Sequence, residues 1–193
     1  MSNAATLGHD VRVIGWVSVA HTFSHFMQLV LPPLFPVMRD AFGVSYTALG
    51  FALSVFYAVS GLMQTPAGFA VDRFGARAVL VFGLVATSCG LLIAAFAPAY
   101  AVLVIAAAVA GLGNAVFHPA DLALLNAKVG NERLGYAFSV HNVGGNVGWV
   151  LAPAFVIGVS AASDWRTAAA AAGCIGLVIA GLVAAQRVLA DAP

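Results

Sequence analysis

The sequence predicts an all-α membrane protein whose 193 residues form six transmembrane helices. Composition is the first reason: 62% of the residues are hydrophobic, only 8% are charged and the mean hydropathy is +1.00, whereas about a quarter of the residues in a soluble domain are charged. The second reason is that the chain divides into uncharged stretches, most of them reaching the roughly 20 residues that cross a bilayer. We therefore expect residues 1–193 to form a single membrane domain.

The positions of charged residues and of one proline define the expected spans. The uncharged stretch 78–120 is too long for one crossing, and we divide it at Pro98 because proline disrupts a helix interior. The expected spans are 13–38, 46–71, 78–97, 100–127, 134–160 and 167–187. The first of them is longer than the apolar core of a signal peptide, so we expect it to remain uncleaved.

Other prolines should change the course of individual helices. Pro32, Pro33 and Pro36 are expected to bend or end the first helix. Pro119 and Pro153 are expected to kink the fourth and the fifth. Bent helices would suit a gate, although neighbouring helices can also repair the hydrogen bond that a proline removes.

Basic residues are divided unequally between the two ends of the expected spans. Arg39 and Arg166 lie at the end opposite the termini. The end that carries both termini has a larger set, namely Arg12, Arg73, Arg77, Lys128, Arg133 and Arg187. Because Lys and Arg accumulate in cytoplasmic loops, we expect a multi-pass protein of a bacterial-type cytoplasmic (inner) membrane with both termini cytoplasmic.

Charge and cysteine content exclude several classes of function. A net charge of +1 provides no basic surface for a nucleic acid. Cys89 and Cys174 both lie in apolar runs and indicate no disulfide framework. No nucleophile, base and orienting acid occur together at an expected aqueous surface, so we expect neither an enzyme nor a cofactor.

A short charged segment connects the second and third spans. It contains Gly68, Asp72, Arg73, Gly75 and Arg77, a spacing that resembles the loop signature of the major facilitator superfamily of transporters. The resemblance implies a 3+3 inverted repeat of six helices, which is half of that fold, and a loop that latches the cytoplasmic side against the other half. Gly68 would provide a close-packing surface. The alternative is a loop that only fixes topology by its positive charge.

The fourth span resembles the superfamily with departures. Four of its residues keep the family spacing: Leu103, Gly111, Gly113 and Ala115. Ala107 and Ala110 stand where an arginine and a glutamine are usual, and because that arginine is linked to proton coupling in the family, another group would have to supply the role. Segments 24–25, 117–120 and 141–146 most resemble the branch of fosmidomycin-resistance efflux proteins.

Polar side chains recur at helical spacing within three of the spans. An ionisable group in a bilayer costs at least a few kcal/mol unless it is paired or hydrated, so each one is a candidate functional residue. The candidates are His21, His25 and Gln28 in the first span, Asn114, His118 and Asp121 in the fourth, and His141, Asn142 and Asn146 in the fifth. The alternative for each histidine is a core residue that hydrogen-bonds a carbonyl of a neighbouring helix.

These residues predict a pathway for a solute and for protons, because histidine exchanges protons near neutral pH. The expected function is a half-size transporter subunit that moves a small solute by alternating access, coupled to protons, after pairing with a second six-helix half. A different partner chain is favoured over a homodimer because a latch joins unlike surfaces. A C-terminal half encoded by the same gene is a further possibility.

Two other functions remain open from the sequence. His21 and His25 lie one helical turn apart and, with His118, Asp121 and His141, could bind a transition metal in a metal-carrier subunit. The chain could also be a non-transporting assembly or regulatory subunit of the membrane, whose role would not depend on the polar residues.

Overall fold

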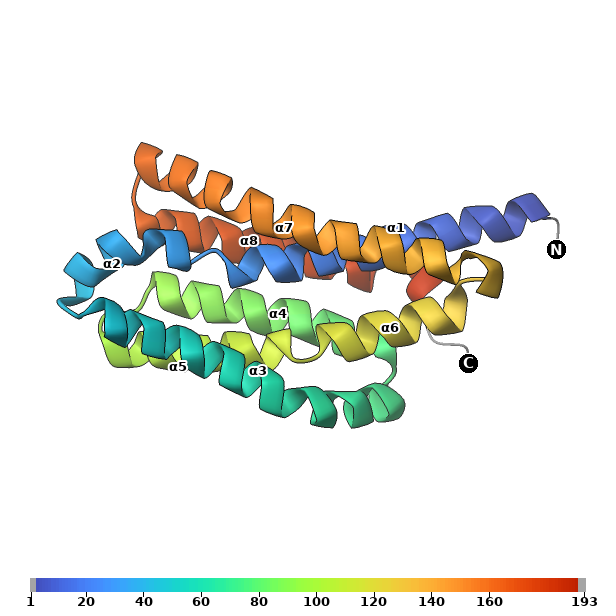
Figure 1. Ribbon diagram of the computed structural model, residues 1–193, viewed down its shortest axis with the longest axis horizontal. Coiled ribbons are helices and arrows are strands. Elements are labelled where there is room, and N and C mark those ends of the chain that lie inside the picture. Colours follow the sequence, from blue (N-terminus) through green and yellow to red (C-terminus); the bar gives the residue numbers. More distant parts are fainter. Residues whose placement is uncertain (1–2, 191–193) are drawn as a thin grey trace.

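In a computed structural model of the protein, residues 3–190 are described, and they form helices joined by short connections (Figure 1). The helices are α1 (Asn3–Gln28), α2 (Phe35–Phe42), α3 (Tyr46–Phe74), α4 (Ala76–Ala95), α5 (Tyr100–Asn114), α6 (Phe117–Lys128), α7 (Leu134–Ala162) and α8 (Trp165–Ala184). Short 3-10 turns add η1 (Pro32–Leu34), η2 (Asn131–Arg133) and η3 (Arg187–Leu189). No β-strand occurs within residues 3–190.

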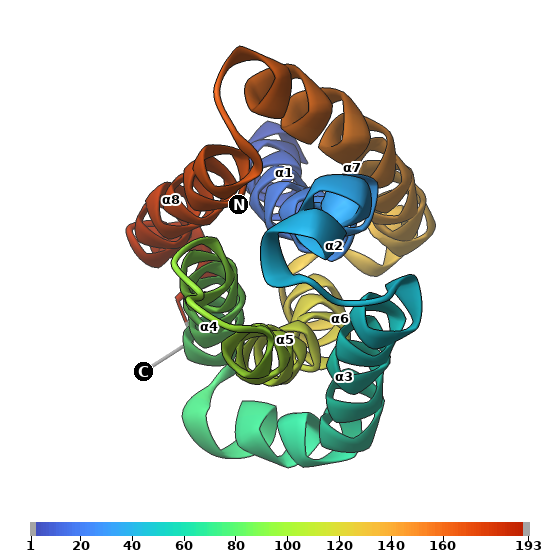
Figure 2. The same ribbon diagram turned by 90° about the vertical axis from the view of Figure 1, so that its left-hand side faces the viewer.

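The helices form an elongated bundle in which both ends of the described chain lie at the same end (Figure 1). The α3–α4 and α6–α7 connections lie at this end too, and the α2–α3, α4–α5 and α7–α8 connections lie at the other. α1 packs mainly on α7, whereas α4 packs on both α5 and α8 (Figure 2). In Figure 2, α7 and the first half of α3 lie on one side, α8 lies on the opposite side, and the second half of α3 runs along the bottom of the view.

The first expected span is not one helix. α1 ends at Gln28, η1 begins at Pro32, and α2 begins at Phe35. Pro32 and Pro36 each lie at the start of their element. The N–H groups in the first turn of a helix have no partner within the helix, so a proline there costs no hydrogen bond. α2 then ends at Phe42, and the next residue, Gly43, has a left-handed φ of 63°. The prolines thus end the long helix and start a short one in its place.

The fourth expected span is divided into α5 and α6 at Ala115 and Val116. Pro119 lies in the first turn of α6, and its ring would clash with the carbonyl of Ala115, four residues earlier, in a continuous helix. The break therefore precedes the proline by one turn. Pro153 does not divide its helix, since α7 continues through it from Leu134 to Ala162.

Five helical stretches among the described residues are long and apolar enough to cross a membrane. They are Tyr46–Phe74, Ala76–Ala95, Tyr100–Lys128, Asn131–Ala162 and Trp165–Ala184. α1 is not among them, and it carries Asp10, Arg12 and the polar side chains of His21 and His25. The lengths and compositions of these helices are those of a multi-pass membrane protein.

Candidate functional site

A buried carboxylate connects α1, α6 and α7. Asp121 on α6 is 0% exposed. Its Oδ2 lies 3.0 Å from His21 Nδ1 on α1 and 3.1 Å from His141 Nε2 on α7. An ionised carboxylate can only accept hydrogen bonds, and in that state each imidazole would donate an N–H to it. One oxygen atom thus joins three helices, and we call these three residues the His-Asp-His cluster.

Glycines of α7 allow α1 to approach this site. A Cβ added at Gly148 would overlap the carbonyl oxygen of Thr22, and one added at Gly145 would lie 3.0 Å from His21 Nε2. The close approach stacks the rings of His21 and His141, whose centroids are 3.6 Å apart at an interplanar angle of 24°. Small residues are the usual means of close helix packing in lipid, and here they also position the imidazoles.

Two further imidazoles and an indole surround the cluster. The ring of His21 lies 4.4 Å from that of His25 and 5.4 Å from that of His118, measured between centroids. The ring of His25 is in turn 4.5 Å from that of Trp149. His25 is half-buried and His118 is exposed. The aromatic group therefore extends from the buried carboxylate to the surface.

A chain of amide hydrogen bonds lies beside the rings. Gln28 Nε2 donates to Asn114 Oδ1 at 3.0 Å, and Asn114 Nδ2 donates to Ser60 Oγ at 2.8 Å. Trp149 Nε1 donates to Gln28 Oε1 at 3.3 Å. Sequence reasoning missed Ser60 and Trp149. Ser60 could have been found as a hydroxyl within an apolar helix, and Trp149 lies on the same face of α7 as His141, about two turns later.

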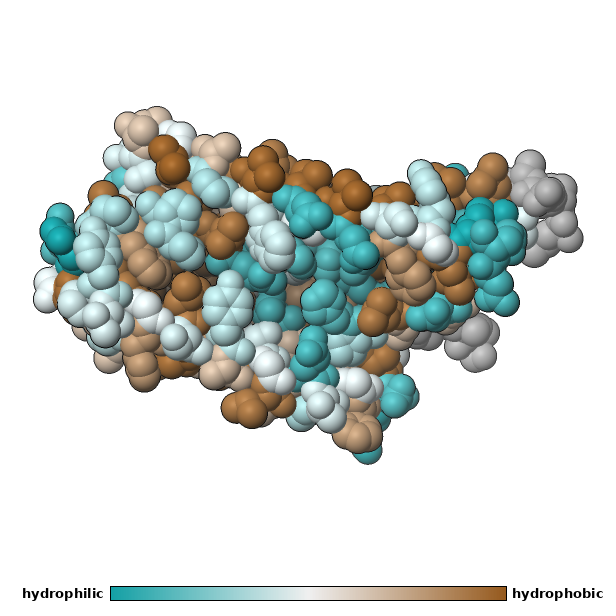
Figure 3. Space-filling model, in the orientation of Figure 1, coloured by the Kyte–Doolittle hydropathy of each residue, from teal (hydrophilic) through white to brown (hydrophobic). Residues whose placement is uncertain are grey.

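The remaining candidates lie on α7 outside these contacts. Asn142 and Asn146 are exposed, and the structure does not bring them into the hydrogen bonds described above. Figure 3 shows a hydrophilic band across α7, α1, α6 and α3 at about mid-length, with a mixed surface of intermediate hydropathy toward α2 and a more apolar surface toward the termini. Such a band in the middle of a membrane protein is expected to face water or another protein surface rather than lipid.

Three donor atoms in the site could hold a metal ion. One ligand atom each from His21, Asp121 and His141 lie within 4.8 Å of one another. Two polar atoms in the same region are buried without a hydrogen-bond partner among the described residues, namely Asp121 Oδ1 and His25 Nδ1. The cluster therefore retains unused donor and acceptor capacity.

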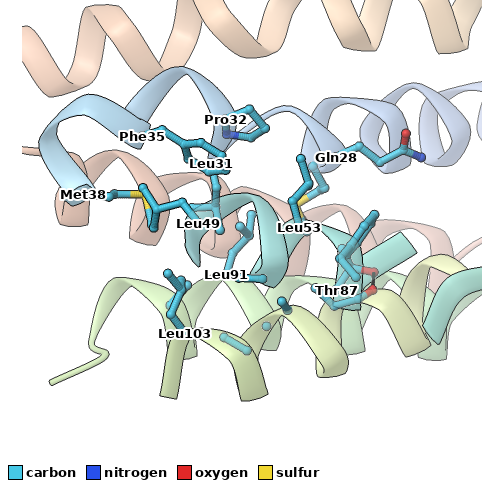
Figure 4. A pocket seen from close by; sticks show the side chains of 18 residues that line it. Gln28, Leu31, Pro32, Phe35, Met38, Leu49, Leu53, Thr87, Leu91 and Leu103 are labelled. Atoms are coloured by element: carbon cyan, nitrogen blue, oxygen red, sulfur yellow. Dashed lines mark hydrogen bonds between the residues drawn. The ribbon is translucent and has the colours of Figure 1, made fainter. Parts of the chain in front are cut away.

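A small cavity separates the cluster from the end of the bundle that carries α2. Its volume is about 40 Å³, and its lining is mostly apolar, including Leu31, Phe35, Met38, Leu49 and Leu91 (Figure 4). Pockets for drug-sized molecules measure about 300–1,000 Å³. This cavity has room for only a few water molecules, and its lining comes from α1, η1, α2, α3, α4 and α5.

The charged segment 68–77 comprises the last turns of α3, the connecting Gly75 and the start of α4. Gly75 alone joins α3 to α4, and its φ of 85° falls in the region that favours glycine. Asp72 and Arg73 are exposed, Arg77 is partly exposed, and Asp72 lines a groove between α3 and α6. A Cβ added at Gly68 would meet no atom within 4 Å. Within the described chain, Gly68 therefore does not provide the helix contact that we expected.

An ion pair connects α1 to the α6–α7 connection. Arg133 Nε donates to Asp10 Oδ2 at 2.7 Å, and the Gly130 N–H donates to the same oxygen at 3.1 Å. Burial raises the pKa of Asp10, but the hydrogen bonds from Arg133, Gly130 and His9 together outweigh it and hold the pKa below its ordinary value. At the same end, Lys128 Nζ donates to the backbone carbonyl of Ala190 at 2.6 Å.

Comparison with known proteins gives a family for this arrangement. Residues 17–191 match the model of the Major Facilitator Superfamily. The chain is 32% identical over 137 residues to the uncharacterized MFS-type transporter YfnC of Bacillus subtilis (strain 168). This match covers 71% of this chain and 33% of YfnC. It is 29% identical over 141 residues to the Fosmidomycin resistance protein of Escherichia coli (strain K12). This second match covers 73% of this chain and 34% of that protein. The matched region is thus about a third of each relative.

Two solved structures share the fold. A bacterial homolog of the human lysosomal transporter Spinster, in an inward-facing and unoccupied conformation, superposes with a TM-score of 0.81 at 16% identity, covering 96% of this chain and 44% of that one. A peptide transporter POT has a TM-score of 0.73 at 20% identity, covering 91% and 38%. The proteins that this chain resembles are transporters and not enzymes, which agrees with the expectation from the sequence. The family match over most of the chain, together with the helical fold and its membrane-length helices, shows that this chain belongs to the major facilitator superfamily of membrane transporters.

Proposed function

We propose that this chain acts as one half of a transporter, moving a small solute across the bacterial cytoplasmic membrane by alternating access after pairing with a second six-helix half. The length relation supports this: the two solved transporters are matched over only 44% and 38% of their chains. Alternating access in this fold moves two halves about a site near the middle of the membrane. α1 with η1 and α2 would serve as the first of six crossings, arranged as 3+3.

The observation that carries the proposal is the polar band on one face of an otherwise apolar bundle (Figure 3). The predicted polar residues of this region come from α1, α5, α6 and α7, and they are His21, His25, Gln28, Asn114, His118, Asp121, His141, Asn142 and Asn146. His21, Asp121 and His141 are buried. A second half packed over α3 and α7 would convert this face into a chamber. We favour a different chain as that partner, because the turn at Asp72 would contact an unlike surface.

The distribution of charge supports one orientation. The connections at the end with both termini carry Arg73, Arg77, Lys128 and Arg133, whereas the opposite end carries Arg39 and Arg166. By the positive-inside rule, the end with the termini is cytoplasmic. The segment from Gly68 to Arg77, where α3 meets α4, then acts as the cytoplasmic gate against the second half.

We assign proton coupling to the His-Asp-His cluster. Asp121 Oδ2 accepts from two imidazoles at once, so an added proton has a hydrogen-bonded place to reside beside the carboxylate. His118 is exposed and its ring lies 5.4 Å from that of His21, which gives the proton a route from the surface. This route would replace the arginine of other family members, where this chain has Ala107.

Transport with matched variants tests the proposal. The chain and its partner are reconstituted in liposomes with a pH-sensitive dye, and fosmidomycin is the first probe because one relative is named for resistance to it. We expect solute-dependent proton movement that falls at least tenfold in Asp121→Asn and His118→Ala, because general acid–base steps contribute about 10²–10⁴-fold. Asp40→Asn, an exposed acid at the other end, should behave like the unmodified chain.

Two results would contradict the proposal. Full activity of Asp121→Asn and His118→Ala in the assembled complex would favour an assembly or regulatory subunit. Blue-native electrophoresis that showed only isolated monomers, both with candidate partner chains and with a second tagged copy, would exclude pairing.

A further inference from the structure

The geometry points to a binding site for a divalent transition-metal ion at His21 Nδ1, Asp121 and His141 Nε2, and we propose Zn²⁺ as the ion that represents this class. The inference concerns a second ligand of the cluster to which proton coupling is assigned above, and the ion would bind these atoms in place of the shared proton. It rests on the fold of this chain and on no partner.

The separation of the donor atoms fits one small ion. The distances from Asp121 Oδ2 to the two ring nitrogens are 3.0 and 3.1 Å, and the three atoms lie within 4.8 Å of one another. Two ligands that are each about 2.0–2.1 Å from a tetrahedral Zn²⁺ lie roughly 3.3 Å apart. Binding would bring the two ring nitrogens, which lie within 4.8 Å of each other, to that separation. It would also spread the stacked rings, whose centroids are 3.6 Å apart, because two ligands of a tetrahedral ion diverge from it.

The charge of the site also favours a cation. With both imidazoles neutral, the cluster carries the single negative charge of Asp121 at 0% exposure. No Lys or Arg of the described chain forms an ion pair with it; its recorded ion-pair partners are the two histidines. An uncompensated buried charge is costly, so a bound cation would stabilise the carboxylate.

A metal ion explains a feature that a shared proton does not. Asp121 Oδ1 is buried and has no hydrogen-bond partner among the described residues. A proton on either ring changes the charge but leaves Oδ1 unpaired, whereas a metal ion can be bound by both oxygens of one carboxylate. Leaving a buried acceptor unpaired costs about 1–3 kcal/mol, which favours the occupant that uses it.

The ligand types select the class of ion. Two imidazoles and one carboxylate suit Zn²⁺ and its neighbours in the first transition row, whereas Ca²⁺ and Mg²⁺ prefer sites made of oxygen atoms. Three protein ligands leave a fourth position for water or for an exchangeable ligand, as in catalytic rather than structural zinc sites. Neutral histidine can place its proton on the other ring nitrogen, so both rings can bind the ion without a change in charge.

Zn²⁺ alone is the probe in the test. The full chain, purified in detergent with a tag that contains no histidine, is titrated with Zn²⁺ against a chromophoric chelator. We expect one ion per chain, and a loss of affinity of at least tenfold in His21→Ala and in Asp121→Asn, because even residues that only support a ligand contribute about 10–100-fold. His141→Gln provides a second ligand variant in case one of these fails to fold, with folding judged by circular dichroism and gel filtration.

Two control variants identify the site. His9→Ala removes an imidazole near the N-terminal end of α1, and His118→Ala removes the exposed imidazole beside the cluster; both should retain one bound ion within about threefold of the original affinity. The proposal is overturned if the unmodified chain binds no Zn²⁺ more tightly than Asp121→Asn does, or if His118→Ala loses the ion while His21→Ala keeps it. Either failure would leave the transport proposal standing, since that is judged by solute and proton movement.

Discussion

At the scale of single residues, Asn114 connects the most distant parts of the site. Its side chain accepts from Gln28 on α1 and donates to Ser60 on α3, so one amide joins three helices. Polar side chains of this kind stabilise helix contacts in lipid by about 0.6–2 kcal/mol each. The amide chain should therefore hold α3 against the rest of the bundle.

Replacing Asn114 by alanine tests this role. We expect Asn114→Ala to lower the free energy of unfolding by about 1–2 kcal/mol, because two hydrogen bonds are lost and two part-buried partners remain. Thermal unfolding in detergent measures the change. Asn126→Ala is the matched control, since Asn126 is exposed and bonds only a carbonyl of its own helix; equal effects of the two variants would contradict the prediction.

The Asp10–Arg133 pair predicts a dependence on pH. The pKa of Asp10 is lowered in the folded protein, so its contribution to stability is present above the unfolded pKa and is lost as the pH falls through the folded pKa. We expect Asp10→Ala to cost about 1.5–3 kcal/mol at pH 7, the usual range for a hydrogen bond to a charged group. The cost should shrink as the pH approaches the folded pKa.

Unfolding midpoints of Asp10→Ala and of the unmodified chain at pH 7, 5 and 3 provide the measurement. Asp40→Ala is the control, because Asp40 pairs with Arg39 at an exposed position where ion pairs contribute little. A cost for Asp10→Ala that stays constant down to pH 3 would show that the charge of this carboxylate is not its source.

The sequence predicted which residue types would lie inside the membrane, but not which of them would meet. Helical spacing placed His21, His118 and His141 at similar depth, and the structure brings the first and last together on Asp121. Asn142 follows His141 directly and so points about 100° away around the helix, which leaves it exposed. Spacing within one helix cannot show how far the next helix is rotated, and that rotation decides the contacts.

At the scale of helices, glycines on α7 determine how closely α1 approaches. Gly148 faces the backbone of Thr22 and Phe26, and Gly145 faces the rings of His21 and His25. The same contact that packs the two helices also stacks the imidazoles. Packing and site geometry are therefore changed together by one substitution.

Gly148→Ala should separate α1 from α7. The added methyl group would overlap backbone atoms, which cannot move as a flexible side chain can, so we expect a loss of about 1–3 kcal/mol. Gly158→Ala on the same helix meets nothing within 4 Å and should be neutral or slightly stabilising, because alanine is the better helix former. Thermal unfolding of both variants checks the difference, and a stable Gly148→Ala would show that the helices do not need this contact.

The helices themselves were more predictable than the breaks within them. Membrane-length stretches of high mean hydropathy indicated α3, α4, α7 and α8. The stretch 13–38 contains no charge, yet it is divided because three prolines fall near one end. A hydropathy pattern records where a chain is apolar, whereas proline chemistry decides where its helix stops.

At the scale of the whole molecule, α3 is the helix that the described chain covers least in its second half. Residues 61–66 are all exposed, and Leu62 and Phe69 are 73% and 71% exposed. α7 has similar exposure, with Val150 at 74%. Lipid or a second half could cover these apolar surfaces, and the two possibilities predict different effects of added bulk.

Gly68→Leu distinguishes them. A side chain at Gly68 meets nothing within 4 Å in this chain, so the isolated protein should unfold within about 0.5 kcal/mol of the original. If the second half packs over this end of α3, the leucine fills the space that the partner needs, and we expect recovery of the tagged partner to fall at least tenfold in a pull-down. Gly181→Leu is the matched control because a side chain there also meets nothing within 4 Å but lies on α8, which packs on α4 and α7, and it should leave pairing unchanged. Equal partner recovery by both variants would mean that this surface of α3 faces lipid, and that the latch between halves must be sought elsewhere.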